Sequence, residues 1–182
     1  RDHTYALDEQ MRPNWPVIEA FCDKYAGQPV LLFGFTFMVW QCLLEPLRER
    51  GLHLPFEQGI LFHSGGWKKL QHLAVDNPAF KARCREQLGL GRVHNFYGMV
   101  EQVGSIFVEC EQGHLHAPVF ADLQVRDPLT HQPLGVGQPG VLHVTPAILR
   151  SYPGHLLPTA DPAVLLREDD RPCGRHRRSS QG

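Results

Sequence analysis

Hydrophobic and polar positions along the first half of the chain predict strands and helices in alternation. Two short apolar runs, residues 30–33 and 59–62, are bounded by glycine or proline, as is typical of buried strands. Residues 92–96 predict a third strand. Helix patterns fill the intervening segments, at residues 16–25, 36–50 and 77–89. This alternation predicts an α/β fold with a parallel sheet over residues 1–104.

The expected helix ends depend on particular residues. Gly51 is placed to end the second helix, and Thr36 to cap its start. Pro46 falls inside that helix, where a proline kinks or divides it. Asn77 is expected to cap the third helix, with Pro78 at its first helical position.

The second half of the chain predicts a β-rich subdomain over residues 105–166. Apolar segments separated by turn-forming residues predict three strands, at residues 105–109, 119–126 and 141–145. From residue 167 the chain is rich in arginine and ends in polar residues. We therefore expect a basic, disordered tail over residues 167–182.

Composition excludes several classes of protein. The 182 residues are 42% hydrophobic and carry a net charge of −1, so we expect a globular protein with no nucleic-acid partner. The most apolar stretch is interrupted by Gly34 and Gln41 and is shorter than the ~20 residues of a membrane span. Five dispersed cysteines favour the reducing cytoplasm over a disulfide framework. The start, Arg-Asp-His, reads as the middle of a longer protein.

One candidate binding loop, Ser64-Gly65-Gly66, follows the second expected strand. Ligands of open α/β sheets bind outside the carboxyl ends of strands, and adjacent glycines let a flat ring or a phosphate approach the backbone. The alternative, favoured when these three residues are taken alone, is a tight strand-to-helix turn.

A second candidate loop, residues 95–101, follows the third expected strand. Tyr97 offers an aromatic face for a base, and Gly98 permits an unusual backbone angle. Glu101 is a hard oxygen ligand suited to Mg²⁺ held by phosphates. The alternative is a surface turn with a solvated glutamate and a half-buried tyrosine.

Two further signals are weaker. Asp161, which follows a Pro/Gly-rich stretch, could accept hydrogen bonds from both hydroxyls of a ribose, or could cap a helix. Cys110, His116 and the distant Cys173 are suitable zinc ligands. Their spacing is not that of a standard zinc finger, and buried cysteines with a surface histidine are the alternative.

Taken in order, these segments resemble one family. The strings Ser-Gly-Gly-Trp-Lys at residues 64–68, Tyr-Gly-Met-Val-Glu-Gln at 97–102 and Ser-Tyr-Pro-Gly-His at 151–155 are similar to those of the bacterial acyl-protein synthetases (LuxE-like), which activate fatty acids in luminescence systems. That family belongs to the acyl-adenylate-forming (AMP-binding) ligases, together with acyl-CoA ligases. The resemblance covers residues 15–175.

The resemblance implies a fold and a reaction. The chain would be part of the large N-terminal domain of an adenylate-forming enzyme. A carboxylic acid, in this family a fatty acid, would attack ATP to give an acyl-adenylate and pyrophosphate. The acyl group would then pass to a thiol acceptor, which could be a protein cysteine, coenzyme A or a carrier. ATP or AMP and Mg²⁺ are the implied ligands, with zinc as a further structural candidate; a homo- or hetero-oligomer is also open.

The resemblance also implies residue roles. Tyr97 would pack on the adenine, Asp161 would hold the ribose and Glu101 would hold Mg²⁺, while residues 30–40 could border an apolar acyl pocket. The other implied nucleotide-site residues line the adenine or border the acyl and phosphate groups: Ser64, Gly65, Gly66, Asn95, Gly98 and Met99.

This sequence departs from the family pattern at several points. Val100 stands where the superfamily commonly has threonine, and Cys173 lies in Arg-Pro-Cys-Gly-Arg where relatives often have Cys-x-Cys-Gly-Arg. The family's phosphate loop lies upstream of this span and its mobile lysine downstream. We therefore expect weak binding of AMP or ATP without turnover by this chain alone. The alternatives are a non-catalytic remnant, a subunit completed by a partner chain, or a zinc-stabilised interaction module.

Overall fold

The chain divides into two units, Arg1–Val93 and His94–Gly182, and passes from one to the other along strand β3 (Arg92–Tyr97). The computed structural model describes residues 3–67, 72, 74–102, 104–148, 157–167 and 179–181.

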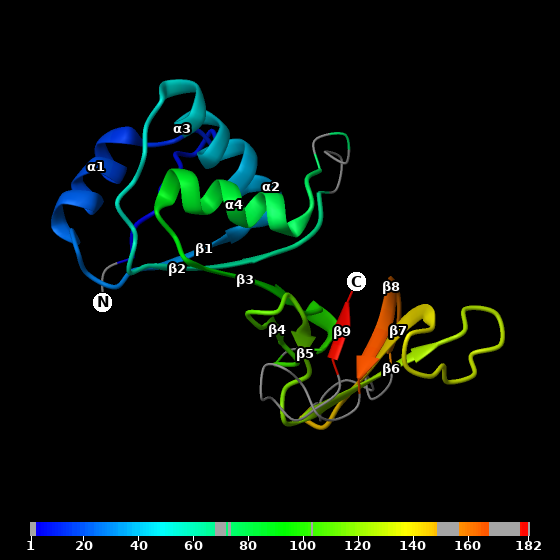
Figure 1. Cartoon of the computed structure of the whole chain (residues 1–182). Coiled ribbons are helices and arrows are strands. Elements are labelled where there is room, and N and C mark those ends of the chain that lie inside the picture. The colour runs from blue at the N-terminus through cyan, green and yellow to red at the C-terminus, as the bar shows by residue number, and fades with distance from the viewer. Residues whose placement is uncertain are drawn as a thin grey trace. The chain divides into compact units, whose positions relative to one another are not determined.

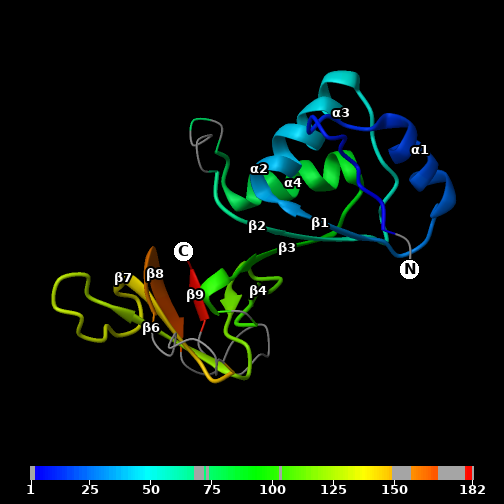
Figure 2. The ribbon, with the colours of Figure 1, turned by 180° about the vertical axis from the view of Figure 1, so that it is seen from behind.

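The first unit is an α/β layer. Strands β1 (Leu31–Phe35) and β2 (Ile60–Ser64) pair in parallel, with Leu32 opposite Leu61. The helices lie together on one side of these strands (Figures 1 and 2). They are α1 (Trp15–Lys24), α2 (Thr36–Val39), α3 (Glu45–Arg50) and α4 (Asn77–Leu88). The expected alternation of strands and helices is thus confirmed.

The two faces of β1 differ in exposure. Leu32 packs against the buried core that includes Leu44, Leu47 and Phe80. Side chains that alternate with Leu32 along the strand point away from this core, because successive residues of a strand face opposite sides. Leu31 and Phe33 are therefore 66% and 70% exposed.

Pro46 divides the second helix as expected. Residues Trp40–Leu44 form a π-helical turn immediately before α3, with α2 on its other side. Proline has no N–H to donate and its ring clashes with the carbonyl four residues earlier, so the wider turn relieves the clash. Gly51, at φ 63°, then ends α3 in the left-handed conformation.

Two expected helix caps are wrong. Asp76, not Asn77, caps α4, because its carboxylate accepts a hydrogen bond from the backbone N–H of Ala79 at 2.8 Å. Thr36 is already inside α2 and makes no capping hydrogen bond. Its hydroxyl instead bonds to strand β2, as described below.

The second unit is an antiparallel sheet that begins at the end of β3. Its strand order is β3-β4-β5-β9-β8-β7-β6. The strands that follow β3 are β4 (Phe107–Glu109), β5 (Leu115–His116), β6 (Ala121–Arg126), β7 (Pro139–Pro146), β8 (Leu157–Arg167) and β9 (Ser179–Gln181). A second core, which includes Phe107, Leu123 and Val144, packs on this sheet. The expected strands at 105–109, 119–126 and 141–145 correspond to β4, β6 and β7.

Strands β5, β8 and β9 were not expected. Strand β8 contains Asp161 and two prolines, Pro158 and Pro162, and its residues read as a loop in the sequence. The alternative in which Asp161 caps a helix is therefore wrong. Strand β9 lies in the expected disordered tail; residues 168–178 and 182 of that tail are outside the described residues.

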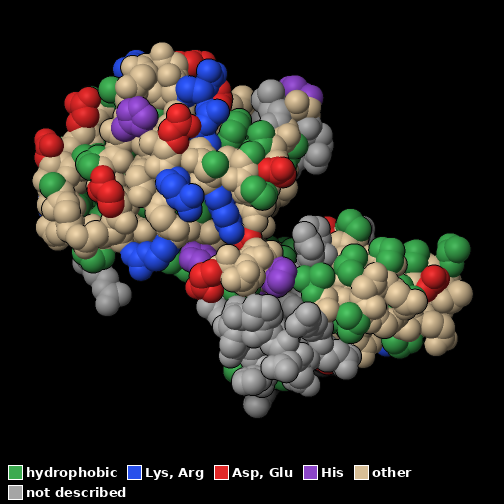
Figure 3. Space-filling model, in the orientation of Figure 1, with side chains coloured by type: hydrophobic (Ala, Val, Ile, Leu, Met, Phe, Trp, Pro, Cys, Tyr) green, Lys and Arg blue, Asp and Glu red, His purple; other side chains and the backbone are tan. Residues whose placement is uncertain are grey.

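The surface of the first unit carries both signs of charge. Figure 3 shows basic and acidic side chains interspersed on the face in view, with hydrophobic groups between them. In the part of the chain that the structure describes, every helix is too short or too polar to cross a membrane.

Candidate functional site

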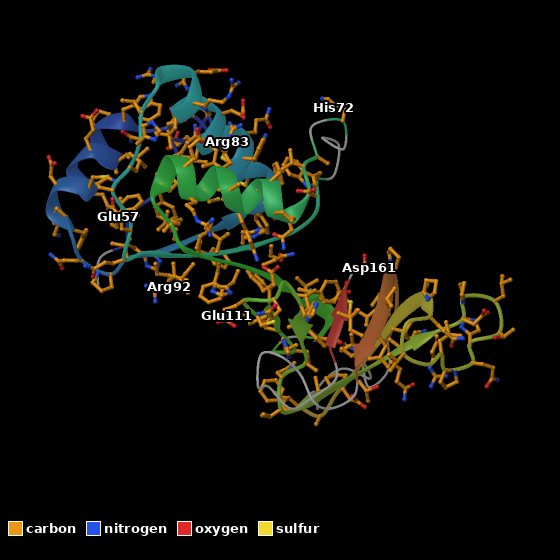
Figure 4. All side chains as sticks on the ribbon, in the orientation of Figure 1. Glu57, His72, Arg83, Arg92, Glu111 and Asp161 are labelled. Atoms are coloured by element: carbon orange, nitrogen blue, oxygen red, sulfur yellow. The ribbon has the colours of Figure 1, made fainter. Side chains whose placement is uncertain are left out.

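Tyr97 and Asp161 meet in the second unit. The Tyr97 hydroxyl donates a hydrogen bond to Oδ2 of Asp161 at 2.7 Å, across 64 positions of sequence. Tyr97 ends β3 and its half-buried ring packs edge-on against Phe107 of β4, with the ring centroids 6.0 Å apart. Asp161 lies on β8 at the surface, where Figure 4 labels it. Two residues expected to bind one adenosine are thus in direct contact.

The surroundings of Tyr97 favour its neutral form. Burial raises the pKa of the Tyr97 hydroxyl, and the hydrogen bond and negative charge of Asp161 raise it further. Glu101 also raises this pKa through its charge, so its carboxylate is within electrostatic range of the ring. Tyr97 is therefore a neutral hydrogen-bond donor to the Asp161 carboxylate.

A bulge in β8 presents Asp161. Val141 of β7 is opposite Pro162 and His143 is opposite Pro158, so residues 159–161 face the single residue Leu142. The Thr159 hydroxyl donates to the Leu142 carbonyl at 3.0 Å and accepts a hydrogen bond from the Asp161 backbone N–H at 3.1 Å. Bulges of this kind change the direction of a side chain. Thr159 thereby replaces the ladder hydrogen bonds that the bulge interrupts.

Glu101 is carried by a 3₁₀ turn over Val100–Gln102. Gln102 anchors this turn: its side chain is fully buried and its Nε2 donates to the carbonyl of Val144 on β7 at 3.0 Å. Met99, just before the turn, packs against the second core. Glu101 itself is exposed, which leaves its carboxylate accessible to a hydrated cation.

Gly98 and Asn95 each contact residues of the neighbouring segment 105–109. Gly98 permits unusual backbone angles, but its φ is not positive here. A Cβ there would lie 2.8 Å from Cδ1 of Ile106, so the end of that flexible side chain would have to shift to admit a larger residue. The backbone N–H of Asn95 donates to the buried carboxylate of Glu109 at 2.8 Å, which fixes β3 against β4.

The Ser64-Gly65-Gly66 loop belongs to the first unit. It begins where the Thr36 hydroxyl contacts Nδ1 of the buried His63 at 2.9 Å and the Ser64 carbonyl at 3.2 Å. Gly65 has φ 81°, a left-handed conformation that favours glycine. Both glycines are exposed, and a Cβ on Gly66 would meet no atom within 4 Å. The role of this loop in binding adenine stays a prediction.

The expected zinc ligands are only partly described. Cys110, which follows β4, is fully buried. His116, on β5, is 7% exposed. Cys173 and residues 151–155 lie outside the described residues. Among the described residues, no group of three or more cysteine, histidine or carboxylate side chains is arranged to hold a metal ion.

Sequence reasoning gave no role to Thr159 and Gln102. The sequence clue to their importance was proximity to an expected binding residue. Gln102 follows Glu101, and Thr159 precedes Asp161 by two residues. What identifies them is their partners, the carbonyls of Leu142 and Val144 on β7, which are distant in sequence.

Known proteins are similar to this chain in sequence. A long-chain-fatty-acid–luciferin-component ligase of Aliivibrio fischeri is 26% identical over 157 residues, and one of Vibrio harveyi is 26% identical over 153 residues. Each alignment takes in 82% of this chain and 40% of the relative, so the chain spans about two fifths of the length of these relatives.

Solved structures share the fold. A 2-hydroxyisobutyryl-CoA ligase, solved in an open conformation with 2-HIB-AMP and CoA, has a TM-score of 0.70 at 22% identity. That similarity takes in 90% of this chain and 34% of the ligase. MatB from Rhodopseudomonas palustris has a TM-score of 0.56 at 16% identity, over 82% of this chain and 31% of MatB. The α/β unit followed by an antiparallel sheet is therefore a segment of the fold seen in these ligases.

The sequence profile of one family matches most of the chain. The description of that family is acyl-protein synthetase, LuxE, and the match runs over residues 16–177. It includes the tyrosine, glutamate and aspartate whose geometry is described above. The chain belongs to the acyl-protein synthetase (LuxE) family.

Proposed function

We propose that this chain provides the nucleoside-binding part of an enzyme that activates a carboxylic acid, in this family a fatty acid, as an acyl-adenylate. The acyl group would then be transferred to a thiol of a protein cysteine, coenzyme A or a carrier, in the cytoplasm. The observation that supports this most is the 2.7 Å contact between Tyr97 and Asp161, which joins two segments assigned to one adenosine.

Within this proposal each side chain has a defined task. The Tyr97 ring, held against Phe107, offers a flat surface to the adenine, and Asp161 accepts hydrogen bonds from the ribose. Gly98 and Met99 border the acyl and phosphate groups. Ser64, Gly65 and Gly66 belong to the first unit, and their role in lining the adenine stays a prediction from the family resemblance; their exposed glycines allow a flat ring to approach the backbone.

Glu101 fits the expected magnesium ligand. It is an exposed carboxylate within electrostatic range of Tyr97, and hard cations prefer oxygen ligands. When bound, Mg²⁺ would neutralise phosphate charge during attack by the carboxylic acid. A zinc ion held by Cys110, His116 and Cys173 stays a separate prediction, and metal analysis of the purified protein tests it.

An apolar cavity in the first unit is a candidate for the acyl chain. It has a volume of about 740 Å³ and is lined by Leu31, Phe33 and Met38 of the apolar stretch at residues 30–40. Phe21 and Phe56 also line it. A mostly apolar cavity of this size is in the range of small-molecule sites.

Nucleotide binding and turnover test the proposal separately. Calorimetric titration of the chain with AMP should show saturable binding that Asp161→Asn weakens. Asp23→Asn, an exposed carboxylate change on α1, should leave it unaltered. ATP–pyrophosphate exchange with a fatty acid should be absent, since this span is two fifths of the relatives' length. AMP binding that is insensitive to Asp161→Asn would contradict the proposed site. ATP–pyrophosphate exchange by the chain alone would contradict the proposal that it provides only the nucleoside-binding part of the enzyme.

A further inference from the structure

The hydroxyl of Tyr97 has a partner that a stacking role for its ring does not explain. An aromatic platform for a base needs only the ring, and phenylalanine would supply it equally well. The Tyr97 hydroxyl nevertheless donates to Oδ2 of Asp161 at 2.7 Å. A hydrogen bond from a neutral donor to a carboxylate is stronger than one between neutral groups.

Each partner in this contact is held by its own strand. The Tyr97 ring is fixed edge-on against Phe107, which is 1% exposed. Asp161 is fixed through its backbone N–H, which donates to the Thr159 hydroxyl. Thr159 also bonds to the Leu142 carbonyl and interacts with the Tyr97 hydroxyl. The position of the Asp161 carboxylate is therefore determined by β3, β7 and β8 together.

This arrangement leaves the two carboxylate oxygens with different tasks. Oδ2 accepts the hydrogen bond from Tyr97, so the carboxylate cannot rotate freely at the exposed end of its side chain. Oδ1 is then presented in a defined direction to a ligand. Pre-organisation of this kind lowers the entropy lost on binding.

We propose that the Tyr97 hydroxyl is a positioning group that orients Asp161 for recognition of the ribose hydroxyls of an adenine nucleotide. The inference rests on the proposed nucleoside site and adds to it a task for the hydroxyl as distinct from the ring. Tyr97 therefore contributes to two kinds of recognition, the base through its ring and the sugar through Asp161.

The test separates the hydroxyl from the ring. Tyr97→Phe keeps the aromatic surface and removes the donor. We titrate the wild-type chain, Tyr97→Phe and Asp161→Asn with AMP and with 2′,3′-dideoxy-AMP, which lacks both ribose hydroxyls. The wild type should prefer AMP, and both variants should lose about fivefold or more of that preference while binding dideoxy-AMP as the wild type does. A purely structural role would weaken both nucleotides equally. Tyr25→Phe, which removes a hydroxyl from α1's carboxyl end, is the matched control.

A double-mutant cycle in urea measures the contact without a ligand. Tyr97→Phe and Asp161→Asn should be non-additive in the unfolding equilibrium, with a coupling of about threefold or more. Additive effects would overturn the inference, as would an unchanged preference for AMP in Tyr97→Phe. Coupling without any AMP binding by the wild type would overturn the ribose role together with the proposed function. Coupling and AMP binding with an unchanged preference would overturn the inference alone.

Discussion

The Thr36 hydroxyl lies 2.9 Å from Nδ1 of the buried His63 and joins the start of α2 to the end of β2. The same hydroxyl donates to the carbonyl of Ser64 at 3.2 Å, so it fixes the residue from which the glycine loop begins. Thr36 is itself buried, and replacing it with an apolar group would leave both partners short of a hydrogen bond.

Thr36→Val should therefore lower the free energy of unfolding by about 1–3 kcal/mol, the cost of leaving a buried polar partner unsatisfied. Valine has nearly the same shape, so the change isolates the hydroxyl. Thr145→Val, at an exposed position near the end of β7, should alter stability by less than about 0.5 kcal/mol. Urea unfolding of the three proteins measures both values, and equal stability of Thr36→Val and the wild type would contradict the prediction.

Gly65→Ala should destabilise the chain by about 1–2 kcal/mol, because alanine is strained in a left-handed conformation. Gly65 has φ 81°, and a Cβ there would also lie 3.3 Å from Cδ1 of Phe35. Gly66→Ala is the control, since a Cβ on Gly66 meets no atom within 4 Å. Thermal unfolding should rank the two variants in this order, and a Gly66→Ala variant that is the less stable of the pair would refute it.

Gln102→Leu should cost about 1–3 kcal/mol and loosen the turn that carries Glu101. The fully buried Gln102 side chain donates to the Val144 carbonyl at 3.0 Å, and leucine cannot replace that donor. Hydrogen exchange of the backbone amides at residues 100–102 should accelerate. Gln112→Leu, in an exposed turn, should leave their exchange unchanged; similar protection in Gln102→Leu would argue against the anchoring role.

Stability should fall at mildly acidic pH because of His143. Burial lowers the pKa of this 5% exposed histidine, and the charges of Arg126 and His131 lower it further. In the described part of the chain, neither of its ring nitrogens has a hydrogen-bond partner. The unfolded chain therefore binds a proton more readily than the folded one, so stability is full above the ordinary pKa of 6.5 and is lost as the pH falls below it.

The contribution of His143 is isolated by substitution. The free energy of unfolding of His143→Gln should depend less on pH between 8 and about 5 than that of the wild type. His53→Gln, a change at an exposed histidine, should keep the wild-type dependence. Parallel pH profiles for His143→Gln and the wild type would show that His143 is not the titrating group.

Mg²⁺ should increase the affinity of the chain for ATP. Glu101→Gln should lower the affinity measured with Mg²⁺ by about tenfold, or ~1.4 kcal/mol. An amide oxygen retains shape but loses the charge that attracts the cation. Binding of AMP without metal should be unchanged. Glu111→Gln alters an exposed carboxylate in the turn after β4 (Figure 4) and should behave as the wild type. A Mg²⁺ effect that persists in Glu101→Gln would exclude this residue as the ligand.

Helix ends show what local sequence can predict. Pro46 and Gly51 have the effects that their own covalent structure imposes, since one lacks an N–H and the other lacks a Cβ. The predictions that Thr36 and Asn77 cap helices were wrong because several nearby side chains could each accept or donate a hydrogen bond. Asp76 is the residue whose carboxylate reaches the backbone N–H of Ala79, and Thr36 bonds to a strand 28 positions away.

Strand β8 shows the limit of pattern reading. Two prolines and few apolar residues make residues 157–162 look like a loop. They form a strand because β7 pairs with residues 157, 158 and 162, and a bulge accommodates residues 159–161. Strand β9 pairs further along β8, at residues 164, 165 and 167. Pairing partners this distant in sequence leave no periodic signal in the segment itself.

The order of motifs along the chain was enough to identify the family and to predict residues for a nucleotide site, because both depend on what each short segment can do chemically. The tertiary structure alone brought the Tyr97 hydroxyl to the Asp161 carboxylate and gave Thr159 and Gln102 their anchoring roles. These contacts depend on strand register and on one bulge. Register is set by packing and hydrogen bonds between segments, which the local sequence of either segment does not specify.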